Sequence, residues 1–335
     1  MNKKSILMQA GLLMGLTLSF ASCDDILGEW DRPTPQTEVP ATETAKYLVW
    51  NSTSKALEAQ DIPSGYISMT NTTTEWNGNY IVDSDVDIMG DVTISGDVNI
   101  ILKDGKTLTV HYKVAGDHKL CIFAQSKDAA TAGKLDFAAE SAAEGSDALN
   151  VGELQIHGGV INASGRASSS SAGGEGIETS GKLYIYAGTV KAYGGAASGA
   201  SGNGGTAISC LGKDFQICLA DVTATGGNST PGGGGNGISY SGASTDPYFK
   251  IDGGTVKAIA GDGTATAGVK CTTIDVNSGK FYAQGNATGQ GVDVSNFYYT
   301  TETLAASGGA SETYGTDIAN GAAPTHRYVK VEPKP

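Results

Sequence analysis

Short runs of alternating apolar and polar residues recur along most of the chain, and glycine-rich stretches separate them. The runs "LYI" at Leu183 and "TVKA" at Thr189 return almost unchanged as "FKI" at Phe249 and "TVKA" at Thr255. Alternation with a period of two predicts β-strands that each bury one face. Because runs this short bury little apolar surface alone, the pattern predicts strands that need stacked neighbours.

The repeating unit contains three strands in a fixed order, and stacking the units aligns their apolar residues in three interior ladders. These ladders are Leu149, Ile177, Ile208, Ile238, Val269 and Val292; then Ile156, Ile185, Ile217, Ile251 and Val276; then Ile161, Val190, Val222, Val256 and Phe281. Stacked units satisfy each other's backbone hydrogen bonds and bury a continuous core. The sequence therefore predicts an all-β fold, a right-handed single-stranded parallel β-helix with three strands per coil, similar to the pectate-lyase solenoid. A β-sandwich is the alternative, and it would need hairpin turns between neighbouring strands.

The β-helix domain is expected to span residues 46–335. Alternating runs in residues 85–110 and the runs "KLCIFA" and "GKLDFAA" predict early coils of the same helix. We expect residues 46–80 to form an N-terminal cap. A weaker copy, "FYY" followed by "TLAASGG", is expected to close the series of coils, and "HRYVKVEPKP" to end the last coil.

The first 45 residues read as targeting and tethering segments. Residues 1–22 combine a basic start with an apolar run, which predicts a signal peptide. The following "FASC" resembles the lipobox of Bacteroidetes-type bacterial lipoproteins, which implies that Cys23 is lipidated and that a lipid anchor is the only membrane attachment. Residues 23–45 are rich in Pro, Thr and acidic residues, which predicts a flexible tether. The acidic pair Asp24-Asp25 resembles the signal that sends such lipoproteins to the outer face of the outer membrane, which implies a protein exposed at the cell surface.

Four further cysteines follow Cys23. Cys210 and Cys271 occupy equivalent ladder positions two coils apart, so their Cα atoms are expected about 10 Å apart at about 4.8 Å per coil. This separation exceeds disulfide reach. We therefore expect free thiols that pack as small apolar groups.

The charge and the outward positions give little sign of catalysis. The formal net charge of −13, with three arginines in the chain, argues against a nucleic-acid partner. The outward residues of neighbouring coils show no stack of two or three carboxylates, which a glycoside hydrolase would need. We expect His157 to be an ordinary surface histidine and Arg166 a solvated loop residue. The glycine-rich loops match calcium-binding nonapeptide repeats only at Asp262, which favours a structural role for the glycines, and no cofactor is required.

Aromatic and basic side chains at outward positions are the remaining candidates for function. Tyrosine rings stack on the C–H faces of sugars while neighbouring polar groups bind the hydroxyls. The candidate glycan-binding residues are Tyr184, Tyr186, Lys191, Tyr193, Tyr248, Lys257 and Tyr282. The alternative for these tyrosines is the ordinary preference of tyrosine for exposed strands.

The segment "GGVINASG…GGEGIETSGKLYIYAGTVKAYGG", residues 158–195, resembles the repeat of carbohydrate-binding β-helix domains of bacterial surface proteins. The resemblance covers residues 145–289. It implies non-catalytic binding of a polysaccharide or of a host or dietary glycan, with calcium in some members. An adhesin or structural cell-surface protein is a second hypothesis, and a divergent polysaccharide lyase is a third.

Overall fold

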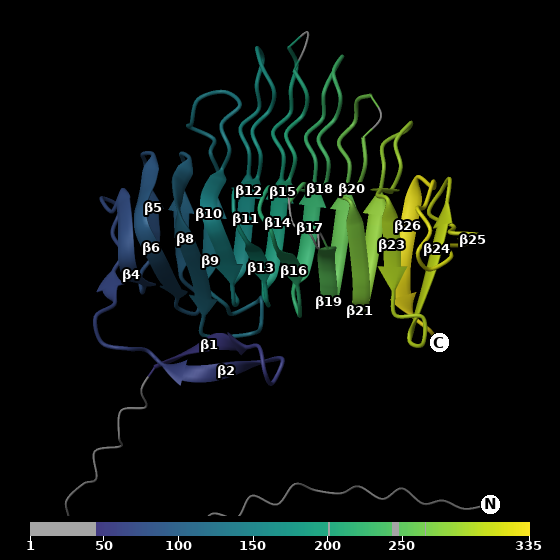
Figure 1. Cartoon of the computed structure of the whole chain (residues 1–335). Coiled ribbons are helices and arrows are strands. Elements are labelled where there is room, and N and C mark those ends of the chain that lie inside the picture. Colours follow the sequence, from purple (N-terminus) through teal and green to yellow (C-terminus); the bar gives the residue numbers. More distant parts are fainter. Residues whose placement is uncertain (1–44, 200–201, 243–247, 265) are drawn as a thin grey trace, which may run out of the picture. The chain divides into compact units, whose positions relative to one another are not determined.

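The computed structural model describes residues 45–199, 202–242, 248–264 and 266–335 (Figure 1). The predicted signal peptide and the lipidation at Cys23 lie outside the described residues, as does the predicted tether apart from Ala45. The described residues contain strands and no helix, and therefore no helix long and apolar enough to cross a membrane.

Parallel strands stack in three ladders, and we name the three sheets the first, second and third face in chain order. Each pair of strands on the first face joins one coil to the next, with Leu149 beside Ile177, Ile177 beside Ile208 and Ile208 beside Ile238. The first face contains the start of β10 (Leu149–Ile156), β12 (Ile177–Thr179), β15 (Ile208–Cys210), β18 (Ile238–Tyr240), β20 (Val269–Lys270) and β22 (Val292–Asp293).

The second and third faces repeat the same arrangement. The second face contains the end of β10, β13 (Leu183–Ile185), β16 (Phe215–Ile217), the starts of β19 (Tyr248–Ile259) and β21 (Thr273–Gln284), and β23 (Asn296–Tyr299). The third face contains β11 (Val160–Ser164), β14 (Thr189–Tyr193), β17 (Asp221–Thr225) and the ends of β19 and β21. All three predicted ladders are confirmed, and their residues are buried. The parallel pairing is that of a β-helix and excludes the β-sandwich.

The predicted early coils are confirmed as well. They contain β5 (Val86–Ile88), β6 (Val92–Leu102), β7 (Thr107–Val110), β8 (Val114–Ala124) and β9 (Lys134–Phe137). The parallel stacking also begins earlier than predicted, since β3 (Ile67–Ser68) and β4 (Glu75–Val82), which pair in parallel with each other and, through β4, with β6, start within residues 46–80, expected as the cap. β8 pairs in parallel with β10, and β9 with β11, so one core runs through the early and late coils. Trp76 and Met69 fill the interior of the first coil.

The cysteines after Cys23 are free and buried, as predicted. Cys210 lies beside Tyr240 on the next coil, which places an aromatic ring between it and the coil of Cys271. Burial raises the pKa of the Cys210 and Cys271 thiols. The thiols therefore stay protonated and pack as small apolar groups.

A hairpin precedes the first coil and packs along the outside of the helix. Its strands β1 (Lys46–Asn51) and β2 (Ala56–Asp61) pair with each other in antiparallel fashion. Tyr47 packs edge-on against Phe123, and Trp50 stacks on Tyr186 at a ring-centroid distance of 5.5 Å. Residues 46–61, at the start of the predicted cap, therefore cover outward side chains of the second face.

The C-terminal end departs from the predicted series. β23 continues the second face in parallel, but β24 (Leu304–Gly309), which contains "TLAASGG", does not pair with the third face. Instead β26 (Tyr328–Pro333) pairs antiparallel with β21 and β24, and β25 (Thr316–Asp317) pairs with β24. The chain returns on itself because a parallel helix otherwise ends in an exposed strand edge, which pairs readily with other chains.

The glycine-rich loops between the third and first faces project from one side of the helix and lie next to each other (Figure 1). Their backbones form a hydrogen-bonded column, in which the Gly205 N–H donates to the Gly195 carbonyl and the Gly227 N–H donates to the Gly205 carbonyl, both at 2.8 Å. A Cβ atom added to Gly205 would lie 1.9 Å from the Gly174 carbonyl oxygen. The glycines are therefore required by the close approach of neighbouring loops.

Candidate functional site

The seven candidate glycan-binding residues divide between two faces of the helix. Lys191, Tyr193, Lys257 and Tyr282 lie on the third face, and the other three lie on the second face. On the third face, Lys257 and Tyr282 are direct neighbours on adjacent coils. Both side chains border one cavity.

That cavity, which we call the terminal cavity, has a volume of about 460 Å³. This volume lies within the usual range for small-molecule sites. Its lining side chains come from β19, from β21 and from the segment between β24 and β25: Thr255, Lys257, Ala258, Ile259, Lys280, Tyr282, Ala283, Gln284, Glu312 and Tyr314.

The tyrosine rings of the terminal cavity are held by a network from β26. The Tyr282 hydroxyl donates to Glu332 Oε1 at 2.6 Å, and Lys330 Nζ donates to Glu332 Oε2 at 2.8 Å. Lys330 Nζ also lies 4.9 Å from the centroid of the Tyr314 ring, a cation–π distance. Burial, followed by the bond to Glu332, raises the pKa of Tyr282 to about 12, so its phenol stays neutral. Both rings are thus positioned before any ligand enters.

Tyr314 adopts an unusual backbone conformation, with φ at +46°. A bulky residue rarely occupies this left-handed region, and such strain is commonly found at functional sites. Tyr314 also packs edge-on against Tyr328, with ring centroids 6.3 Å apart. Tyr314 could not be identified from the sequence pattern, because the residue lies outside the repeat.

Two lysines give the terminal cavity a positive character. Neither Lys257 nor Lys280 makes an ion pair within the described residues, and Glu312 is the one carboxylate of the lining. Lysine donors beside tyrosine rings can bind hydroxyl or carboxylate oxygens of a ligand.

The other third-face candidates lie on the same surface outside the cavity. Lys191 is exposed and lies between Asn162 and Thr223 of the neighbouring coils. Tyr193 is 42% exposed. They form an open surface several coils before the terminal cavity.

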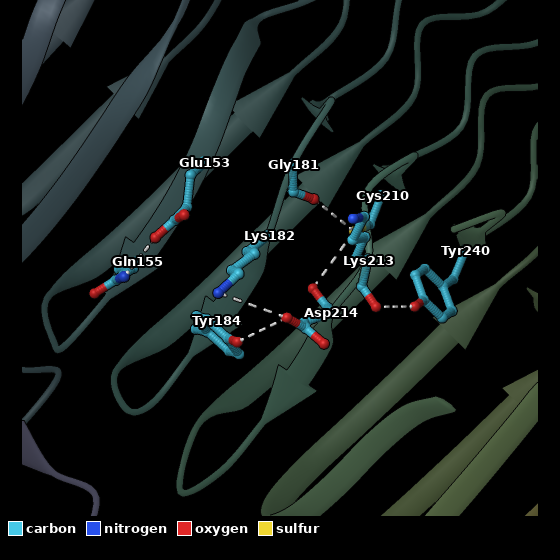
Figure 2. A network of polar contacts seen from close by, with 9 residues as sticks. All are labelled: Glu153, Gln155, Gly181, Lys182, Tyr184, Cys210, Lys213, Asp214 and Tyr240. Carbon is cyan, nitrogen blue, oxygen red and sulfur yellow. Dashed lines mark hydrogen bonds and ion pairs between the residues drawn. The ribbon is translucent and has the colours of Figure 1, made fainter. Parts of the chain in front are cut away.

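On the second face, Tyr184 belongs to a polar network that Figure 2 shows from close by. Its hydroxyl donates to Asp214 Oδ2 at 3.3 Å, and Lys182 Nζ lies 3.7 Å from the same oxygen. Tyr184 also stacks on Tyr186, with ring centroids 5.6 Å apart. Tyr186 packs under Trp50 of the hairpin, so Tyr184 is the more accessible of the two.

His157 corrects the expectation of a surface histidine, because it is only 6% exposed. Its ring stacks on Phe123 at 4.6 Å, and its Nδ1 accepts the Trp50 N–H at 2.9 Å. Burial lowers the pKa of His157 to about 4, so the ring is neutral and its proton is on Nε2. The sequence missed this role because the hairpin that buries His157 is remote in the chain.

A cluster of acids corrects the expectation that neighbouring coils bring no carboxylates together. Asn150 Nδ2 donates to Asp147 at 3.1 Å and to Glu178 at 2.8 Å, and the Glu175 N–H donates to Asp147 at 2.7 Å. Burial first, and then the charge of Glu178, raises the pKa of Glu175. Asp147 and Glu175 lie just before the first-face strands. Because alternation assigns an outward direction only to residues within a strand, the sequence pattern did not identify these two acids.

The comparisons with known proteins add no relative: no family model, curated protein or solved structure matches the chain. Within the described residues, no group of three or more His, Cys, Asp or Glu side chains has a metal-binding arrangement.

Proposed function

We propose that the protein is a lipid-anchored cell-surface protein of the outer membrane that binds polysaccharide without cleaving it. The observation that supports this proposal is the terminal cavity, where two pre-positioned tyrosine rings face a space bordered by lysine and glutamine side chains. In this proposal Cys23 carries the lipid, residues 23–45 form the tether, and the β-helix presents the cavity to a host or dietary glycan.

Four of the lining residues have a role in this proposal. Tyr282 and Tyr314 stack on the apolar faces of a sugar ring, and the network through Glu332 and Lys330 keeps them in place. Lys257 and Gln284 supply hydrogen bonds to hydroxyls. Pre-positioned rings lower the entropy cost of binding, which favours rigid aromatic residues in such a site.

The test is a polysaccharide array with the purified protein and the variant Tyr314→Ala. Loss of one stacking ring is expected to weaken binding about tenfold, which corresponds to about 1.4 kcal/mol. Tyr112→Ala serves as the matched control, since Tyr112 lies in the bend between β7 and β8, on earlier coils. Equal binding by wild type and Tyr314→Ala would contradict the site, and absence of binding to every polysaccharide would contradict the function.

A further inference from the structure

A second cavity lies on the second face, formed by the same two long strands that form the terminal cavity. Its volume is about 500 Å³. The lining side chains are Tyr248, Lys250, Asp275, Tyr298, Tyr299, Thr300 and Asn320. We call it the second-face cavity. Among these residues only Tyr248 is one of the seven candidate glycan-binding residues.

The floor of this cavity is a row of outward residues in register across successive coils. Lys250 of β19 lies beside Asp275 of β21, and Asp275 lies beside Tyr298 of β23. The row therefore presents a cation, a carboxylate and an aromatic ring along the helix axis. The opposite charges of Lys250 and Asp275 leave the floor without a net charge.

The aromatic side chains of this cavity retain unused hydrogen-bonding groups. Lys250 Nζ lies 5.5 Å from the centroid of the Tyr248 ring and makes no ion pair with a described residue. In the described part of the chain, the hydroxyls of Tyr248 and Tyr298 have no hydrogen-bond partner. Ring faces with free hydroxyls beside them match the alternating apolar and polar surface of a pyranose.

One wall of the second-face cavity is fixed by the C-terminal segment. Tyr299 donates its hydroxyl to the Ile318 carbonyl at 2.8 Å, and its N–H donates to Asn320 Oδ1 at 2.9 Å. These bonds hold Tyr299 and Asn320 in place. The second-face cavity is therefore pre-formed on one side, as ligand sites usually are.

The two cavities open on different faces because β19 and β21 bend between them. Gly254, with φ at +69°, and Gly279, with φ at +85°, lie at these bends. Lys250 borders the second-face cavity and Lys257 the terminal cavity, on opposite sides of the bend in β19. The two cavities share no lining residue and are treated as separate sites.

We propose that the second-face cavity is a second saccharide site that takes an uncharged pyranose, so that one molecule holds two sugar units on two faces. This inference rests on the proposed function and adds a separate site to it. It assigns Tyr298 and Tyr248 as stacking residues, and Lys250, Asp275 and Asn320 as hydrogen-bonding residues.

The experiment follows the tyrosine ring signals of ¹³C-labelled protein by NMR during titration with methyl β-D-glucopyranoside, methyl β-D-galactopyranoside and methyl β-D-glucuronide. The inference expects a neutral glycoside to shift the signals of Tyr248 and Tyr298 as well as those of Tyr282 and Tyr314. Tyr298→Ala should abolish the response of Tyr248 and leave that of Tyr314 unchanged. If Tyr298→Ala fails to fold, Lys250→Gln gives the same test, because Lys250 is exposed and its replacement leaves the core intact.

Three results would overturn the inference. If only Tyr282 and Tyr314 respond, the second site is absent while the proposed function stands. If the glucuronide shifts Tyr298 and neither neutral glycoside does, the assigned sugar class is wrong. If no tyrosine responds and the polysaccharide array shows no binding, the inference and the proposed function both fail.

Discussion

Acidification is expected to loosen the N-terminal hairpin through His157. The hairpin and the stacked rings of Phe123 and Tyr186 surround His157, and its Nδ1 accepts the Trp50 N–H. Protonation would remove this acceptor and place a charge in a buried site. Tyr186, whose ring centroid lies 4.8 Å from that of His157, and Cys121 stay neutral because burial raises the pKa of each. His157 is therefore the group that titrates here between pH 7.5 and 5.

The sign and size of the effect follow from the two pKa values. The pKa of His157 is about 4 with the hairpin docked and 6.5 when the ring is exposed. The undocked state therefore takes up a proton that the docked state excludes, and docking is fully stable above pH 6.5. Between pH 7.5 and 5 the equilibrium constant for docking of the hairpin should fall about 30-fold, which corresponds to about 2 kcal/mol. Further acidification to pH 4 should bring the total loss of docking free energy to roughly 3 kcal/mol.

Hydrogen exchange of the β1 and β2 amides measures this change. After correction for the intrinsic exchange rate, their protection should fall about 30-fold from pH 7.5 to 5, while the amides of β12 and β15 keep theirs. His157→Phe provides the matched control, because Phe123 occupies the equivalent position one coil earlier. This variant should show weaker but pH-independent protection. Protection of the wild-type hairpin that stays constant over this pH range would refute the reasoning.

Two further predictions concern the glycine column and the acid cluster. Gly205→Ala should lower the free energy of unfolding, measured with denaturant, by about 1–3 kcal/mol, because the added Cβ overlaps the Gly174 carbonyl. Gly90→Ala is the control and should change little, since the nearest atom to its added Cβ lies at 3.8 Å. Equal losses in the two variants would contradict the packing argument. Glu175→Gln should raise the melting temperature at pH 8. Because the pKa of Glu175 is raised in the folded protein, its stabilising contribution is present below the pKa of the unfolded chain and is lost as the pH rises through the folded-state pKa. Glu144→Gln should lower the melting temperature instead, since hydrogen bonds from Ser169 lower the pKa of Glu144; the reverse order would contradict both assignments.

The repeat determined the β-helix because a β-helix is built from local alternation. Leu149, Ile177 and Ile208 could be aligned from the sequence, since parallel stacking places equivalent residues of successive coils side by side. The same alignment placed Lys257 beside Tyr282 and left the cysteines unbridged. Inward and outward positions thus follow from period two alone.

What the sequence left open depends on segments that do not repeat. Tyr314 completes the terminal cavity, Glu332 holds Tyr282 in it, and Asn320 completes the second-face cavity, all from the C-terminal return of the chain. Trp50 reaches His157 from 107 positions away. No periodic pattern encodes these contacts, because they arise from the packing of distant segments. The tertiary structure therefore decided which outward side chains are covered and which border a cavity.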